Sequence, residues 1–452
     1  MSAVPPLSES GPGRLGEELP ALVTGVPGPE SRAWLARFAA VAAPMGPRPA
    51  RTVSGEPNAS GTIVYREGVG SNVVDVDGNR YVDLAAGFGS LLLGHRPAGV
   101  RRALGEQADR LFQSLGDLHP SDVKIRLLER LAARFGGGQG ILGQSGADAL
   151  SAALKSAMLS TGRAGVVAFA GSYHGLSYGP LALCGLRQSY RAPFAGQLNP
   201  NVRFVEYPGR PAALEPALAV VRGELQRGDV GALVFEPILG RGGVVVPPPG
   251  FAEGLAALCR EHGAVLVADE VWTGLGRAGE WLLSQAQGAR ADVVCLGKGL
   301  GGGLPISACF GTPEVMASWS RDEEVVHTST FAGAPLAAAA ALETLDALEA
   351  QRLVERARRL GPMFADALRA EFPASWPRGW EVRGAGFMLG VDLGPGGASA
   401  LELSRALLAR GYVVSLGGGR RDNLVLTPAL DVAEVQLEAF ARAFGASLRA
   451  LP

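Results

Sequence analysis

Lys298 stands out among the residues that could do chemistry, because the sequence contains few lysines. The 452 residues hold three, Lys124, Lys155 and Lys298, although Lys and Arg together number 42. A guanidinium stays protonated, so arginine cannot replace lysine where an amine must lose its proton and attack a carbonyl group. Lys298 follows an apolar run and precedes a glycine-rich turn, where a ligand can approach the backbone closely. This context leaves open a catalytic amine or a surface lysine that closes a strand.

Carboxylate and aromatic residues also follow apolar runs. Asp269 comes directly after the run 264–268, and Tyr173 and His174 lie among glycines after the run 166–169. An aspartate at such a strand end needs a cationic partner, and an aromatic ring there can stack on a flat ligand. Each residue alone also has a structural interpretation, as a helix cap, an ion pair or a packed ring.

The third candidate is an anion site. Ser145, Gly146 and Ala147 follow the run 140–143 and open a helical pattern. Free backbone N–H groups and the helix dipole at such a position favour an anion, although a plain serine N-cap explains the serine equally well. An amine, a carboxylate, an aromatic face and an anion cradle together match the needs of one cofactor, pyridoxal 5'-phosphate.

The elements that must position these residues alternate along the middle of the chain. Helical patterns at 147–160, 212–226 and 251–262 separate short apolar runs, which is typical of a mainly parallel sheet covered by helices. We therefore predict an α/β fold with a seven-stranded sheet. Its predicted strands are 140–143, 166–169, 202–205, 232–235, 264–268, 293–296 and 306–310. Ligands of such sheets bind beyond the carboxyl ends of the strands.

The chain ends predict a second, smaller domain. Residues 1–30 are rich in Pro, Gly, Ser and Glu and are expected to form a mobile arm. Residues 31–95, with three short strand patterns, and 346–452, with strands and helices, are expected to build a small α+β domain around the large domain, 96–345. The long helical pattern 334–371 is expected to lead from one domain to the other.

Composition indicates an ordinary globular protein. Hydrophobic residues make up 47% of the chain and the formal net charge is −1, so neither nucleic acid nor a membrane is expected as a partner. The sequence shows neither a membrane-spanning run nor a signal-peptide pattern. Four cysteines, without metal-ligand spacing, lie in apolar surroundings. We expect a cytoplasmic protein without a metal site.

Taken together, the motifs resemble those of a known family. From about residue 60 to about 440, the chain is similar to the class III aminotransferases, which are pyridoxal-phosphate enzymes of fold type I. The resemblance depends on the order and spacing of six short motifs. They are Ser145-Gly146-Ala147, Tyr173-His174-Gly175, Glu236-Pro237, Asp269-Glu270-Val271, Gly297-Lys298-Gly299 and Thr330-Phe331.

The resemblance implies roles in cofactor binding. Lys298 matches the lysine that forms the Schiff base, and Asp269 matches the partner of the pyridine nitrogen. Tyr173 and Val271 match the residues on the two faces of the ring. The cofactor site is also expected to include Ser145, Gly146, Ala147, His174 and Glu236.

It also implies a partner subunit and a substrate clamp. Thr330 matches a hydroxyl that reaches the phosphate of the neighbouring subunit, so a homodimer with shared active sites is expected. Arg383 matches an arginine that grips a substrate carboxylate, a task suited to a bidentate guanidinium. The implied reaction moves an amino group from a small amino donor to a 2-oxo acid acceptor through Lys298.

Three departures from the family lie around the cofactor and the substrate. Arg241 replaces a glutamate that, in ω-aminotransferases, can pair with the arginine matching Arg383; Arg241 either points to solvent or binds an anion of its own. Leu239 replaces a glutamine beside the cofactor. Leu176 replaces an arginine, which counts against acetylornithine as the substrate. An aminomutase or racemase on the same scaffold, and a cofactor-binding protein without turnover, are alternatives that the residues leave open.

Overall fold

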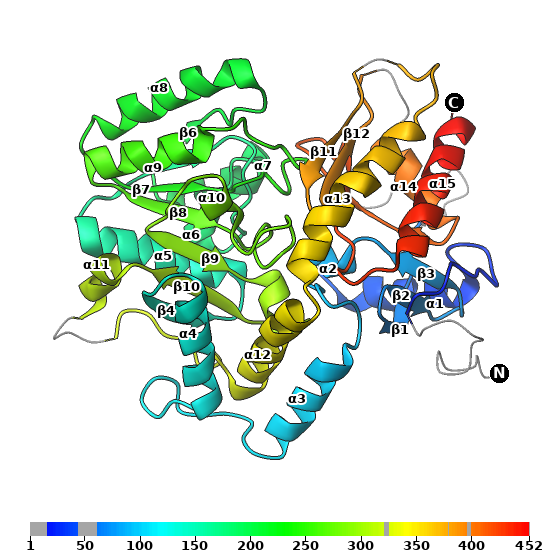
Figure 1. Cartoon of the computed structure of the whole chain (residues 1–452), viewed down its shortest axis with the longest axis horizontal. Coiled ribbons are helices and arrows are strands. Elements are labelled where there is room, and N and C mark those ends of the chain that lie inside the picture. The colour runs from blue at the N-terminus through cyan, green and yellow to red at the C-terminus, as the bar shows by residue number, and fades with distance from the viewer. Residues whose placement is uncertain (1–15, 44–60, 321–324, 378, 396–398, 452) are drawn as a thin grey trace.

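The computed structural model describes residues 16–43, 61–320, 325–377, 379–395 and 399–451. Two parts are visible in Figure 1: a large sheet with its helices, and a smaller part that contains both ends of the described chain. No helix in these ranges is long and apolar enough to cross a membrane.

The large part is built on the seven-stranded sheet that the sequence predicts. Its order is β4-β10-β9-β8-β7-β5-β6, and all neighbours are parallel except those of β10. The bounds are β4 (Gln139–Gly143), β5 (Gly165–Phe169), β6 (Val202–Val205), β7 (Val230–Phe235), β8 (Val265–Asp269), β9 (Val293–Leu296) and β10 (Ser307–Gly311). Strands β5, β7 and β8 are buried throughout, as continuous apolar runs in a covered parallel sheet should be.

Helices cover both faces of this sheet (Figure 1). Helix α5 (Gly146–Thr161) packs on β9 and β10, while α9 (Phe251–His262) packs on β8 and on α8 (Leu214–Leu225). Helices α4 (Asp122–Arg134) and α3 (Ala98–Ala108) pack against α12 (Pro335–Ala350). Helix α5 starts with a Ser145 capping box and ends at Gly162, whose φ of 67° suits glycine.

The topology brings several strand ends to one edge. Because β10 is antiparallel to both β4 and β9, strand β4 runs in the same direction as β9 and the other parallel strands. Strands β4, β5, β7, β8 and β9 therefore all end at the same edge, and the motifs that follow them in the sequence come together there.

The smaller part combines both ends of the chain. Strands β1 (Tyr65–Val69), β2 (Asn72–Asp75) and β3 (Arg80–Asp83) form an antiparallel sheet, to which β13 (Tyr412–Val413) adds in parallel beside β3. A second antiparallel sheet has the order β11-β12-β15-β14. Its bounds are β11 (Glu381–Ala385), β12 (Met388–Asp392), β14 (Ser415–Gly417) and β15 (Asn423–Leu426).

Three helices pack around these sheets. Helix α13 (Leu353–Ala370) packs on β11 and α15 (Glu434–Ala450), and α14 (Ala400–Leu408) packs on α15. The remaining long helix, α1 (Pro29–Val41), starts with a proline in its first turn. The fold is thus the α/β arrangement with a small α+β domain that the sequence predicts, while the exact domain boundaries stay predictions.

Two expectations need correction. The segment predicted as a mobile arm is packed from Gly16 onwards: Ala21 pairs with Arg80, and the Asn79 side chain accepts hydrogen bonds from the backbone of Val23 and Thr24. This segment has little regular structure and is held by side chains of the sheet, and sequence periodicity does not reveal such contacts. Residues 1–15 lie outside the described ranges.

The long helical pattern 334–371 is two helices, because Arg352 takes a left-handed conformation with φ 51°.

Candidate active site

The residues that follow the strand ends line one cavity of about 240 Å³. It lies at the carboxyl edge of the sheet, where all the strands except β10 end, as the topology requires. Its lining residues are Ser145, Gly146, Ala147, Tyr173, His174, Gly175, Glu236, Arg241, Asp269, Val271, Trp272 and Lys298. The structure therefore brings together every predicted site residue except Thr330 and Arg383.

Asp269 and His174 form a buried pair at the floor of this cavity. The Nδ1 atom of His174 lies 2.7 Å from Oδ2 of Asp269, and Oδ1 of Asp269 accepts a hydrogen bond of 3.1 Å from the Val271 N–H. Burial lowers the pKa of His174, but the hydrogen bond and negative charge of Asp269 outweigh it, so this pKa is raised overall. The ring of His174 and the carboxylate of Asp269 thus hold each other in place. The carboxylate of Asp269 is therefore fixed in position in the cavity lining.

Lys298 lines the same cavity. It follows β9 by two residues and has φ 39°, an uncommon conformation for a residue with a side chain. Its Nζ lies 4.5 Å from the ring centroid of Trp272. Burial lowers the pKa of Lys298 despite the nearby Asp269 and Glu236 carboxylates, and Arg241 lowers it further. A lowered pKa favours the neutral amine that nucleophilic attack requires.

The other two lysines are occupied elsewhere. The Lys124 Nζ lies 2.6 Å from Oδ1 of Asp117, and the Lys155 Nζ donates to the Val326 carbonyl at 2.6 Å. Lys298 is thus the one lysine in the cavity lining.

The N-terminus of α5 forms one wall of the cavity. Ser145 Oγ accepts from the Asp148 N–H at 3.2 Å, and the Asp148 carboxylate accepts from the Ser145 N–H at 3.0 Å. This capping box leaves the N–H groups of Gly146 and Ala147 without partners inside the helix. A Cβ added to Gly146 would lie 2.8 Å from a methyl group of Val271, so the wall approaches Val271 too closely for any larger residue. Backbone donors and the helix dipole favour a phosphate here.

Glu236 ties two loops of the cavity together. Its buried carboxylate accepts hydrogen bonds from the Tyr173 N–H at 2.8 Å and from the Gly240 N–H at 3.0 Å. Burial raises the pKa of Glu236 to about 7; His174 opposes this rise and Asp269 adds to it. Through these two bonds Glu236 fixes the backbone that carries the Tyr173 ring and the hairpin that carries Arg241.

Arg241 lies in the cavity lining and not in open solvent. Its hairpin is closed by reciprocal backbone bonds of 3.0 and 3.1 Å between Leu239 and Val245. The guanidinium carbon lies 5.6 Å from the ring centroid of Tyr173 and 6.0 Å from that of Phe88. Within the described ranges, no carboxylate pairs with Arg241. Of the two alternatives for this residue, the solvent-pointing one does not fit this placement.

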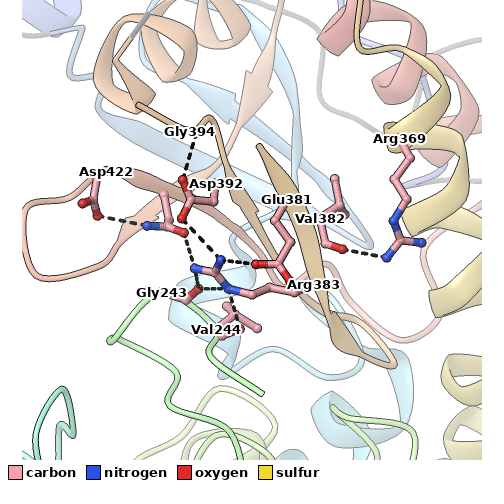
Figure 2. A network of polar contacts seen from close by, with 10 residues as sticks. Gly243, Val244, Arg369, Glu381, Val382, Arg383, Asp392, Gly394 and Asp422 are labelled. Atoms are coloured by element: carbon pink, nitrogen blue, oxygen red, sulfur yellow. Dashed lines mark hydrogen bonds and ion pairs between the residues drawn. The ribbon is translucent and has the colours of Figure 1, made fainter. Parts of the chain in front are cut away.

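Arg383 is bound within the protein (Figure 2). Its Nε donates to the carbonyls of Gly243 and Val244, and its two terminal nitrogens donate to Glu381, Asp392, Gly243 and Asn423 at 2.7–3.3 Å. A guanidinium has five N–H donors, and these contacts engage all of them. Arg383 does not line the cavity. In this structure the contacts of β11 and its neighbours occupy Arg383, and its role as the clamp on a substrate carboxylate stays a prediction.

Thr330 lies outside the cavity of its own chain. It is exposed, and its carbonyl accepts a hydrogen bond of 2.7 Å from the Gln113 side chain. An exposed position is what a hydroxyl that serves another subunit needs, so the prediction for Thr330 stays a prediction.

Two aromatic residues of the site were not predicted. Trp272 lines the cavity beneath the Lys298 amine, and its buried indole N–H has no partner in the described part of the chain. Phe88 faces Arg241 from a turn in which Gly87 and Phe88 both have φ 58°. Trp272 stands beside the Asp269 motif and could have been suspected, whereas Phe88 is distant in sequence and offered no signal.

The residues of the cavity fit pyridoxal phosphate. The unpartnered N–H groups at Gly146 and Ala147 suit its phosphate, and the Asp269–His174 pair suits its ring nitrogen. The Tyr173 and Val271 side chains can enclose its ring, and the amine of Lys298 can hold its aldehyde. Fold and site together define a pyridoxal-phosphate-dependent transferase of fold type I.

Sequence comparison gives the family. The model of the class-III aminotransferases matches residues 54–448, so the chain belongs to this family and is a pyridoxal-phosphate-dependent aminotransferase. It is 39% identical to the acetylornithine aminotransferase of Mycolicibacterium smegmatis over 383 residues, which are 84% of this chain and 92% of that protein. The resemblance drawn from the motifs is thus confirmed.

Solved structures agree with this assignment. The ornithine aminotransferase of Toxoplasma gondii, described with partial occupancy of PLP, has a TM-score of 0.82 at 28% identity, covering 93% of this chain and 94% of that one. An amine transaminase from an uncultivated Pseudomonas species, in its PLP-bound form, has a TM-score of 0.81 at 27% identity, covering 91% and 98%. The comparisons favour neither the isomerase nor the cofactor-binding protein without turnover.

Proposed function

We propose that this aminotransferase works through Lys298, with Asp269 and His174 as its fixed charges and the N-terminus of α5 as its phosphate site. The observation that carries the proposal is the convergence of the amine, the buried carboxylate–imidazole pair and the helix end on one cavity. When bound, the cofactor supplies an electron sink for the carbon that carries the amino group.

Each residue of the site would have its own role in the reaction. Lys298 would hold the cofactor through its amine and would carry a proton to and from the reacting carbon of the substrate. Its lowered pKa supports this role, because an amine that loses its proton easily can act as both base and acid. Asp269 would hold the ring nitrogen, and His174 would keep the Asp269 carboxylate in place.

The substrates we propose are a small amino donor and a 2-oxo acid acceptor. The relative from Mycolicibacterium smegmatis is named an acetylornithine aminotransferase, which makes acetylornithine the first donor to test. Leu176 argues against it, because a leucine that is 49% exposed replaces an arginine and cannot bind a carboxylate. A screen of amino acids and amines, each with pyruvate and with 2-oxoglutarate, would identify the pair.

We also propose a cytoplasmic homodimer. The exposed position of Thr330, beside the exposed Phe331, supports a role in the partner's site. All four cysteines are buried free thiols, although Cys295 and Cys309 lie opposite each other on neighbouring strands; this supports a reducing compartment. Sedimentation would test the dimer.

The function is tested by following the absorbance of the bound cofactor while a donor amine is added. We expect the absorbance to change with the donor alone and to return with the 2-oxo acid. A bound cofactor whose absorbance no donor alters would contradict the proposal. Conversion of a donor to an isomer without any 2-oxo acid would favour a racemase or an aminomutase.

A further inference from the structure

We propose that Arg241, held in place by Arg383, binds the substrate carboxylate in this enzyme. The inference rests on the proposed function, because it names the residue that would select the 2-oxo acid and the corresponding amino acid. It reverses the roles that the family resemblance implies: the arginine on β11 becomes a positioning residue, and the arginine of the hairpin 239–245 becomes the receptor.

The first argument is that Arg241 is available for an anion. It is the one arginine among the residues that line the cavity, and in the described part of the chain its guanidinium contacts aromatic rings and no carboxylate. A guanidinium in a partly enclosed cavity is stabilised by an ionised partner, and a carboxylate matches its donors bidentately. The rings of Tyr173 and Phe88 leave those donors free, because ring contacts use the face or edge of the group and not its hydrogen-bonding capacity.

The second argument is that Arg383 is not available. Its donors are engaged by two carboxylates, one amide and two backbone carbonyls (Figure 2). Its side chain is 16% exposed. A substrate carboxylate could reach Arg383 only after displacing the Glu381 or Asp392 carboxylate, which would gain one ion pair and lose another.

The third argument is that Arg383 holds the hairpin that carries Arg241. Two of its nitrogens donate to the carbonyls of Gly243 and Val244, at distances of 2.9–3.1 Å. From the other side, Glu236 accepts the Gly240 N–H at 3.0 Å, and the Arg241 carbonyl accepts the Gly418 N–H at 2.9 Å. The backbone around Arg241 is therefore fixed by side chains and strands on both sides, so its guanidinium is preorganised for a ligand.

The charged side chains of the cavity also favour Arg241 as the residue that binds the substrate carboxylate. Asp269 and Glu236 place acidic side chains in the cavity lining, and Arg241 adds a positive charge that reaches Lys298 and lowers its pKa. An incoming carboxylate beside Arg241 would offset this effect. We therefore expect acids to be preferred over neutral compounds of the same size, opposite to the preference that a glutamate at position 241 would give.

Glutarate is a suitable probe because it has neither an amino group nor a keto group and cannot react. Its neutral counterpart, glutaramide, has the same length. Isothermal titration calorimetry measures the dissociation constant of each compound for the cofactor-loaded enzyme. The measurement is made on the parent and on the variants Arg241→Gln, Arg241→Lys and Arg383→Gln. Arg37→Gln is the matched control, because Arg37 also lies over a ring, 4.1 Å from the Trp34 centroid, on the helix α1 far from the cavity lining.

In Arg241→Gln we expect the glutarate dissociation constant to rise about 10- to 100-fold, the loss of a charge-assisted hydrogen bond pair. Glutaramide affinity should hardly change, so the preference for the acid disappears. Arg241→Lys, which keeps the charge without the bidentate geometry, should lie between parent and Arg241→Gln. Arg37→Gln should bind both compounds as the parent does. Unchanged glutarate affinity in Arg241→Gln would overturn the proposal.

The double variant separates positioning from direct binding. If Arg383 acts through Arg241, Arg383→Gln weakens glutarate binding in the parent but not in the Arg241→Gln background. A loss that persists in that background would make Arg383 a direct ligand and contradict the assignment. If Arg383→Gln fails to fold, the comparison of Arg241→Gln with Arg37→Gln still tests whether Arg241 binds the carboxylate. If the parent enzyme failed to show the absorbance of a bound cofactor, the proposed function would be contradicted but this inference would not. Calorimetry measures the binding of the glutarate carboxylates directly and requires no turnover.

Discussion

The two ends of the cavity differ in how closely they follow the family. At the cofactor end, Lys298, Asp269 and Tyr173 stand where the motifs of class III aminotransferases place them, and the structure brings them together. At the other end, which we propose binds the substrate acid and call the acid end, Arg241 stands where the family resemblance implies a glutamate, and Arg383 is bound to neighbouring groups of the protein. The cofactor is common to the family whereas the substrate is not, so a departure at the acid end can alter specificity and leave the chemistry intact.

The largest effect that tests this comparison is expected at Lys298. Lys298→Ala removes both the attachment point and the proton carrier, so kcat should fall by at least about 10⁴-fold. Lys155→Ala is the matched control, because Lys155 lies on α5 and donates to the Val326 carbonyl outside the cavity. The measurement is the steady-state rate with a saturating donor. Substantial activity in Lys298→Ala would contradict the assignment of Lys298 as the lysine that holds the cofactor.

The next effect concerns the buried pair. Asp269→Asn removes the carboxylate that we propose holds the ring nitrogen and leaves a side chain of the same shape, so we expect kcat to fall about 10²- to 10³-fold. Cofactor binding should largely survive, as absorbance would show. Asp229→Asn, which changes an exposed carboxylate paired with Arg203, serves as control. Near-normal turnover in Asp269→Asn would mean that the charge has no catalytic role.

A smaller effect is expected from the partner subunit. Thr330→Ala should weaken cofactor binding by about 1–3 kcal/mol, the loss of a hydrogen bond to a charged group. Thr328→Ala, two residues away and also exposed, should leave cofactor affinity unchanged. Equilibrium dialysis of the cofactor measures both variants. An active monomer, or equal affinity of Thr330→Ala and the parent, would refute the shared site.

The smallest effect is a pH dependence that arises from Glu236, which joins the two ends. Its pKa is raised from 4.5 to about 7 by burial, so the folded state holds a proton there that the unfolded state has lost between these values. Stability from this group is present below pH 4.5 and is lost as the pH rises through about 7. Relative to Glu236→Gln, the parent's melting temperature should therefore fall between pH 4.5 and 7. A difference that stays constant with pH would show that Glu236 keeps an ordinary pKa.

Sequence reasoning reached the sheet and the cofactor end because local patterns determine them. Continuous apolar runs mark buried parallel strands, and the residue that follows such a run must lie at the carboxyl edge of the sheet, as Asp269 does. Lys298 was marked by the scarcity of lysine in the rest of the chain. Such signals need no knowledge of distant contacts.

The contacts of the arginines at the acid end could not be predicted from local sequence patterns. Whether Arg383 is free depends on Gly243, Asp392 and Asn423, which come from a hairpin and two strands that meet only in the fold. A motif match gives the position of an arginine and not its partners. The packing of residues 16–28 was missed for the same reason, because the Asn72 and Asn79 side chains that hold them lie more than 50 residues away.

The most direct test of the cofactor assignment is chemical trapping of the cofactor on its lysine. The purified enzyme is loaded with pyridoxal phosphate, reduced with borohydride, digested and mapped by mass spectrometry. We predict that the label lies on Lys298, the one lysine in the cavity lining. A label on Lys124 or Lys155, or a reduced protein without label, would contradict the assignment on which the rest depends.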